Sequence, residues 1–276
     1  MRKKFLSIPY VVWMALFVVI PLVLIVIYAF TAPDGNFTAD NISGLGTYAN
    51  VFGRSLWLAF VATIISLIIG YPFAYILSKE SAAMQRITMM LIMLPMWINF
   101  ILRTYSWMSI LENTGLINQL LGKLGILAAL GVDYIPLINT DGAVVLGMVY
   151  NYLPFMIMPI YSVIIKLDRS VIEAAQDLGA NSFNVFFRVI FPLSLPGVLS
   201  GITMVFVPSI STFAISKLLG GGKDLLLGDL IEMQFLGGAY NPHLGSALSL
   251  VMMIIVMICM YLMNRFGEGE EQAVLL

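Results

Sequence analysis

Six long apolar stretches divide the chain, and they constrain its fold more than any other feature of the sequence. They cover residues 9–30, 56–78, 87–111, 143–165, 197–216 and 244–264. A helix needs about 20 mainly apolar residues to cross a bilayer, and each stretch meets that length. A soluble domain carries roughly 25% charged residues, whereas this chain has 11% and is 60% hydrophobic. The sequence therefore predicts an all-α, polytopic membrane protein with six transmembrane helices, in a single membrane domain over residues 1–276.

The distribution of Lys and Arg predicts the orientation, because cytoplasmic loops are enriched in these residues. With the N-terminus inside, nine cations fall inside: Arg2, Lys3, Lys4, Lys79, Arg86, Lys166, Arg169, Arg188 and Arg265. Four fall outside: Arg54, Lys123, Lys217 and Lys223. We therefore expect both termini to be cytoplasmic. The first apolar run is longer than the roughly 7–15 residues of a signal-peptide core, so we interpret it as a retained span.

Composition and isolated residues exclude several functions. The net charge of −1 gives no basic face for nucleic acid. Cys259 and His243 are the single cysteine and the single histidine, so a metal site is not expected. No glycine-rich loop ends in Lys followed by Ser or Thr, so ATP would have to be bound by another chain. We therefore expect no cofactor on this chain.

The predicted inside segment 166–196 is long for a connector and has a helical pattern of its own. Its first helix has two alternative starts, a capping box of Ser170 and Glu173 or an N-cap at Asp168. Gly179 stands where a helix commonly ends in the left-handed conformation. A second helix is expected from Ala180 to about Phe191, stopped by Pro192. Its apolar stripe, which should pack on the membrane domain, consists of Phe183, Phe186, Phe187 and Ile190.

The same segment resembles the EAA motif of bacterial ABC import permeases. Glu173-Ala174-Ala175, then Gly179, and then Pro192-Leu-Ser-Leu-Pro196 have the spacing of that motif. The resemblance implies a type I importer fold in the bacterial inner membrane, with 166–196 as the coupling segment between spans four and five. The residues it assigns to coupling are Glu173, Ala174, Ala175, Asp177 and Gly179. It further implies three kinds of partner: an ABC ATPase dimer that holds ATP and magnesium, a second permease subunit, and an extracytoplasmic solute-binding protein.

A second resemblance covers nearly the whole chain. The third span contains Trp97-Ile-Asn99 and Arg103, and the last outer loop contains Gly220-Gly-Gly-Lys-Asp224. These pieces resemble the spermidine/putrescine importer permeases, specifically the first of their two membrane subunits. The resemblance implies a non-catalytic subunit that forms half of a polyamine pathway.

Aromatic and acidic residues on the expected outer side are the candidate pathway residues. Aromatic rings attract ammonium groups, although they are equally consistent with helix packing or an interfacial belt. The acids either attract a cation or contact a binding protein. The candidates are Trp97, Asn99, Tyr105, Trp107, Tyr150, Asp224 and Asp229.

Arg103 and Lys217 fit a polyamine pathway least well. Asn99, Arg103 and Trp107 are spaced i, i+4 and i+8, so a continuous third helix would place them on one face. An intramembrane arginine would repel a polycation, so we expect a structural or gating role, paired with Glu112 or another outer acid, or snorkelling to the interface.

Three alternatives remain. The transported solute could be an anion, such as phosphate or sulfate, or a ferric chelate. An intramembrane enzyme would need a set of catalytic groups that the sequence does not offer near its spans. A self-gated ion channel is the third. Copurification with an ATPase subunit separates both of the last two from a permease.

Overall fold

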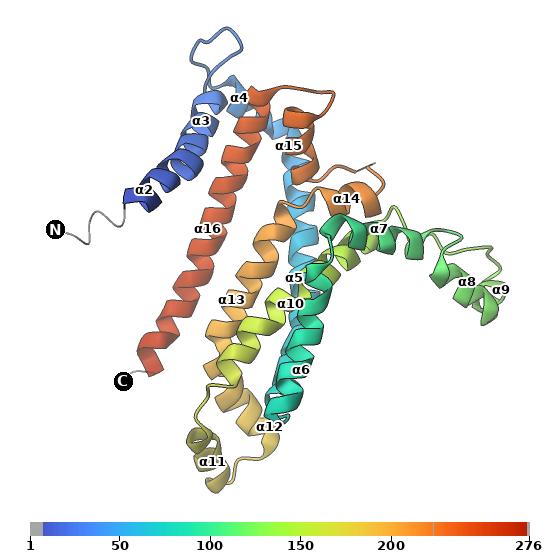
Figure 1. The fold of residues 1–276 in the computed structure, drawn as a ribbon, viewed down its shortest axis with the longest axis vertical. Coiled ribbons are helices and arrows are strands. Elements are labelled where there is room, and N and C mark those ends of the chain that lie inside the picture. Colours follow the sequence, from blue (N-terminus) through green and yellow to red (C-terminus); the bar gives the residue numbers. More distant parts are fainter. Residues whose placement is uncertain (1–7, 223, 275–276) are drawn as a thin grey trace.

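The computed structural model describes residues 8–222 and 224–274, and its regular elements are helices joined by loops (Figure 1). The predicted basic residues Arg2, Lys3, Lys4 and Lys223 lie outside this part of the chain. Five helical stretches are long and apolar enough to cross a membrane, and a sharply bent sixth brings the total to the predicted six.

The first span is α2 (Ile8–Met14), a π-helical turn (Ala15–Val19) and α3 (Ile20–Ala29), and it packs mainly on α16 (Pro242–Val274). The short α4 (Asp40–Ser43) and a 3-10 turn (Gly44–Tyr48) lead into α5 (Ala49–Ser78). The body of the first span is exposed and apolar, as expected of a helix that faces lipid or another membrane chain.

Three spans form the centre of the bundle: α5, α10 (Asp141–Ile164) and α13 (Phe191–Ile210). Glycine permits their close approach. A Cβ at Gly197 of α13 would lie 2.8 Å from the Pro159 carbonyl oxygen of α10, and one at Gly201 would lie 2.8 Å from the Met156 sulfur. Small residues at such contacts let membrane helices pack backbone to backbone. The Tyr71 hydroxyl of α5 also bonds to Ser194 of α13 at 2.8 Å.

The prediction of one continuous third span was wrong. The chain forms α6 (Ala82–Met93) and a 3-10 turn (Leu94–Trp97), and then α7 (Phe100–Leu111) starts a new direction. The axis of Phe100–Lys123 is bent by 90° from that of Ala82–Trp97. The Asn99 side chain accepts hydrogen bonds from the Ile101 and Leu102 amides, so it caps the new helix and stabilises the break.

The fifth span also differs from its predicted limits. It begins earlier, because α12 (Ser182–Val185), a π-helical turn (Phe186–Ile190) and α13 form one helix. Pro192 does not stop it, and stands in the first turn of α13, directly after the π-helical turn. The span ends at Ile210, before the short α14 (Ala214–Leu219), rather than at residue 216.

The remaining helices lie at the two ends of the bundle. α11 (Arg169–Asp177) and α12 form one end, which we call the α11 end; α4, α14 and α15 (Leu227–Leu236) form the opposite one, the α15 end (Figure 1). α8 (Leu116–Lys123) and α9 (Ile126–Leu130) extend sideways from α7.

Candidate functional site

The helix α11 starts at the second of the two predicted caps. The Asp168 carboxylate accepts a hydrogen bond from the Ser170 amide at 2.9 Å, and the helix runs from Arg169 to Asp177. Those hydrogen bonds from Ser170 lower the pKa of Asp168 below its ordinary value of 3.8. The first turn of α11 is therefore held by a charged cap at neutral pH.

Gly179 ends α11 as predicted, in the left-handed conformation with φ of +82°. The Gly179 amide donates to the Gln176 carbonyl at 2.9 Å, and the Ala180 amide donates to Ala175 at 3.0 Å. This pair of bonds is a Schellman closure, which satisfies carbonyls that the helix end leaves open. Asn181 then caps α12 by accepting from the Asn184 amide at 2.8 Å.

The predicted coupling residues lie together on this helix and are accessible. Glu173, Ala174, Asp177 and Gly179 are exposed, and Ala175 is half-buried. Glu173 also lines a groove of about 560 Å³ between α11 and the ends of α5, α6 and α10. Other polar residues along this groove are Lys79, Glu80, Gln85, Arg169 and Gln176. The arrangement leaves α11 free to contact another protein.

The apolar stripe predicted for the following helix is divided, which corrects the expectation that all of it packs on the membrane domain. Phe186 lies against Tyr75 and Tyr71 of α5, with ring centroids 4.9 and 5.7 Å apart. Ile190 is buried as well. Phe183 and Phe187 instead remain 67% and 50% exposed, because the π-helical turn shifts the helix register between them and Ile190. Phe186 and Ile190 therefore anchor the segment, and two rings stay available.

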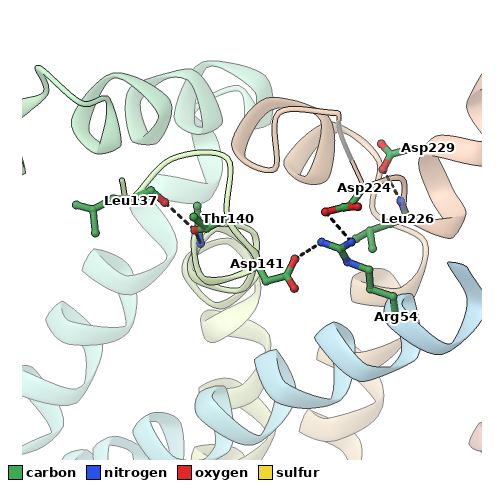
Figure 2. Close-up of polar contacts among 8 residues, drawn as sticks. Arg54, Leu137, Thr140, Asp141, Asp224, Leu226 and Asp229 are labelled. Carbon is green, nitrogen blue, oxygen red and sulfur yellow. Dashed lines mark hydrogen bonds and ion pairs between the residues drawn. The ribbon is translucent and has the colours of Figure 1, made fainter. Parts of the chain in front are cut away.

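A second set of charged residues lies at the α15 end (Figure 2). Arg54 of α5 forms ion pairs with Asp141, at the start of α10, and with Asp224, in the loop before α15. The Arg54–Asp224 distance is 2.9 Å. Their side chains border a cavity of about 200 Å³, which Asn139 and Ser216 also line. The guanidinium therefore ties three separate segments together at this end.

Asp229 lies in α15, outside the spanning helices, and is 4% exposed. One carboxylate oxygen accepts from the Leu226 amide at 2.9 Å (Figure 2), and the other has no hydrogen-bond partner among the described residues. Burial raises the pKa of Asp229 above its ordinary value of 3.8. Nearby, Lys217 pairs with Glu232 at 3.2 Å, so the lysine that fits a polyamine pathway poorly has a counter-charge.

The predicted pathway residues of the third span are not brought onto one helix face. Asn99 precedes α7 as its cap, while Trp97 and Tyr105 are 85% and 46% exposed. Trp107 does meet Tyr150 of α10, edge to face, with centroids 5.3 Å apart. The i, i+4, i+8 prediction therefore holds only for the two members inside α7, since the break removes Asn99.

Arg103 is 9% exposed, in the first turn of α7. The expected pairing with Glu112 is not seen, and Arg103 forms no ion pair within residues 8–222 and 224–274. Snorkelling to the interface does not describe a side chain that is this enclosed.

Comparison with known proteins decides the family. Residues 66–268 match the family model described as "Binding-protein-dependent transport system inner membrane component". The chain belongs to this family. It is 40% identical to the spermidine/putrescine transport system permease protein PotB of Haemophilus influenzae, over 93% of this chain and 91% of that protein. The PotB of Escherichia coli K12 is 37% identical over 88% of this chain and 90% of its own length.

Solved structures support the same architecture. The bacterial ABC transporter that imports alginate has a chain with a TM-score of 0.77 and 16% identity, which covers 97% of this chain and 95% of its own length. The MetNI methionine ABC transporter gives a TM-score of 0.56 at 18% identity, over 82% and 95%. This transport component therefore has the fold of a type I ABC importer permease, a multi-pass and non-catalytic membrane subunit.

The sequence did not single out the Arg54 cluster of this transport component. Arg54 and Asp141 are 87 positions apart, and each pair member alone is an ordinary charged residue next to a span. The sequence contained one indication of this cluster. Arg54 and Asp141 stand at the starts of two spans that enter the membrane from the same side. Asp224 and Asp229 were predicted as pathway residues, and nothing in the structure tests that role.

Proposed function

We propose that this chain is a permease subunit of an ATP-driven importer of polyamines such as spermidine and putrescine. The observation that carries the proposal is the similarity to permeases named for spermidine/putrescine transport, at 37–40% identity over most of the chain. The charged residues of the α15 end agree with a cationic solute. By sequence, the segments assigned to this side carry eight acids and only four bases, which are Arg54, Lys123, Lys217 and Lys223. An excess of negative charge raises the local concentration of a polycation.

The α15 end is the proposed outer face, which receives solute from an extracytoplasmic binding protein, and both termini are cytoplasmic. The excess of Lys and Arg in the opposite segments supports this orientation. In Figure 1, α16 runs from the α15 end toward the α11 end, which agrees with a C-terminus on the side of α11. ATP and magnesium are bound by a partner ATPase dimer, and a second permease subunit completes the pathway.

The α11 segment is the proposed contact with the ATPase. Exposed Glu173 and Asp177, together with the fixed elbow at Gly179, give a short rigid helix suited to a groove on another protein. Glu173→Lys should reduce copurification of the ATPase and abolish uptake, with membrane insertion intact. Asp133→Lys, the same charge change in an exposed loop on the other side, is the matched control. Full uptake by the Glu173 variant would contradict the docking role.

The decisive experiment is uptake by the whole assembly. The chain is reconstituted in vesicles with its ATPase, second permease and binding protein, and labelled spermidine, putrescine, phosphate and sulfate are compared. ATP-dependent accumulation of the polyamines alone is expected. Accumulation of an anion in their place would overturn the substrate assignment and leave the importer class intact. Spermidine affinity that is unchanged in Asp229→Asn would remove that residue from the pathway.

A further inference from the structure

Arg103 is a buried cation that has no counter-charge among the described residues. The residue is 9% exposed, and its Nε is enclosed without a hydrogen-bond partner among the described residues. A buried guanidinium without an acceptor is strongly unfavourable, because the low dielectric of the interior does not replace its hydration. The remaining exposure means that a group from outside the chain can reach it.

The depth of Arg103 excludes a lipid headgroup as that group. Trp107, one turn further along α7, packs edge to face on Tyr150 of α10, which has nine residues of that helix before it and fourteen after it. At 1.5 Å per residue, the two ends of the span are therefore about 14 and 21 Å away. Phosphates lie outside a hydrocarbon core roughly 30 Å thick, so they are too distant from the midpoint of a span.

No acid forms an ion pair with Arg103 among the described residues. Asp141 and Asp224 pair with Arg54, Glu232 pairs with Lys217, and buried Asp229 accepts from the Leu226 amide. Asp40 and Asp141 stand at the very start of two spanning helices, and the remainder of the spans, residues 8–29, 49–78, 82–111, 142–164, 191–210 and 242–267, contains no Asp or Glu. A second copy of this chain would therefore bring no carboxylate to the depth of Arg103.

We infer that Arg103 pairs with a carboxylate in the middle of a span of a second permease subunit whose sequence differs from this chain. The inference rests on the proposed function, in which two permeases form the pathway. The side of α7 that carries Arg103 is open to a second chain, since Asn99 and Ser106, one turn before and one turn after it, are exposed. The pair neutralises a charge that would otherwise repel a polyamine, and it makes a homodimer of this chain unfavourable.

Assembly in detergent, measured without any solute, tests this pairing. The tagged chain is coexpressed with the second permease and the ATPase, and the amount of second permease recovered per tagged chain is compared between variants. Arg103→Glu should lower that ratio at least tenfold, and Arg103→Lys should keep most of it. Lys123→Glu, the same charge change at an exposed position of α8, should leave the ratio unchanged.

Charge reversal identifies the partner group. Each Asp or Glu within the spans of the second permease is changed to Lys in turn, and one of these changes should restore assembly with Arg103→Glu. If Arg103→Glu does not accumulate in membranes, Arg103→Met is used in its place. The loss of assembly caused by Arg103→Met should then not add to the loss caused by changing the identified acid to Asn.

Three results would overturn the pairing: a wild-type ratio in both Arg103→Glu and Arg103→Met, loss of assembly that no reversal restores, or protection of the wild-type chain by sulfate that Arg103→Met abolishes. The last would assign Arg103 to an anionic solute. Failure of spermidine uptake by the wild-type assembly would remove the proposed substrate but would not change the assembly ratios.

Discussion

The two ends of the bundle are stabilised in different ways. At the α11 end, Asp168, Gly179 and Asn181 close short helices through hydrogen bonds to residues two to five positions away. At the α15 end, Arg54 joins Asp141, 87 positions along the chain, and Asp224. The first end is a set of locally determined caps around an exposed helix, and the second is a cluster that forms only when distant segments have come together.

This difference has a consequence for mutations. A change in a local cap alters one helix and leaves the remainder of the bundle in place. A change in the Arg54 cluster removes contacts between α5, α10 and the loop before α15, so its effect is spread over the fold. We therefore expect mutations at the α11 end to lower activity while stability is retained. Mutations at the α15 end should alter stability.

Gly179→Val should have the largest effect. Valine is unfavourable at φ of +82°, so the elbow after α11 would change direction. We expect ATP-dependent uptake to fall at least tenfold while the amount of protein in the membrane is unchanged. Gly179→Asn should retain most activity, because asparagine tolerates this conformation.

Gly35→Val is the matched control, since Gly35 has φ of +84° and open space around it, in the loop before α4. Uptake in this variant should remain near the wild-type rate. Equal losses in both valine variants would mean that backbone strain alone, and not the position in the α11 segment, accounts for the effect.

Arg54→Met should lower stability, because it removes both ion pairs of the cluster. The three side chains are partly exposed, so the loss should be only about 1 kcal/mol, or roughly 2–4 °C in the melting temperature. High salt should narrow the difference between variant and wild type. A difference that is independent of salt would indicate that packing of the Arg54 side chain, rather than its charge, stabilises this end.

Asp229→Asn should change the pH dependence of stability. Because burial raises the pKa of Asp229 in the folded state above 3.8, the folded protein holds this proton more tightly than the unfolded chain. Stability contributed by the group is therefore lost as pH rises from 3.8 through the raised pKa. Thermal melts between pH 4 and pH 8 should show a smaller decline in the variant, which keeps an oxygen acceptor for the Leu226 amide. An identical decline would assign the pH dependence to other groups.

Asp168→Ala should have the smallest effect, confined to α11. Its lowered pKa has the opposite sign, so the stability of the cap is present above pH 3.8 and lost as pH falls through the lowered value. Hydrogen exchange of the amides in the first turn of α11 should become several-fold faster in the variant at neutral pH. Exchange in α13 should not change, and faster exchange there would show that the cap is coupled to the bundle.

The accuracy of sequence prediction follows the same division. The end of α11 at Gly179 was predicted, and its start was narrowed to two alternative caps, of which Asp168 is the one that forms, because such caps act on their immediate neighbours. Apolar stretches of spanning length predicted the number of spans, since hydrocarbon imposes that length on any helix that crosses it. The pairing of Arg54 with Asp141 could not be predicted, because no local pattern records which distant segments meet.

The break in the third span shows a second limit. Hydropathy is the same in a straight and a bent apolar segment, so residues 87–111 were predicted as one helix. Pro95 in the 3-10 turn and the capping position of Asn99 decide the bend. The same break removed Asn99 from the face of Arg103 and Trp107, and the error in fold became an error in the predicted site.

One continuous helix is formed by α12, the π-helical turn and α13, so a change of angle at one end moves the other end. Its 29 residues, Ser182–Ile210, extend about 43 Å at 1.5 Å per residue. A tilt of only about 5° at the α12 end displaces the other end by about 4 Å, on the scale of a helical turn's rise. Because Ser211 follows immediately and the helix stops there, that displacement arrives where the chain can change direction, beside α14. A small change of angle at the α12 end would therefore become a translation at the end of α13, where the Tyr152 hydroxyl, from the middle of α10, lies 3.5 Å from the Pro208 carbonyl oxygen.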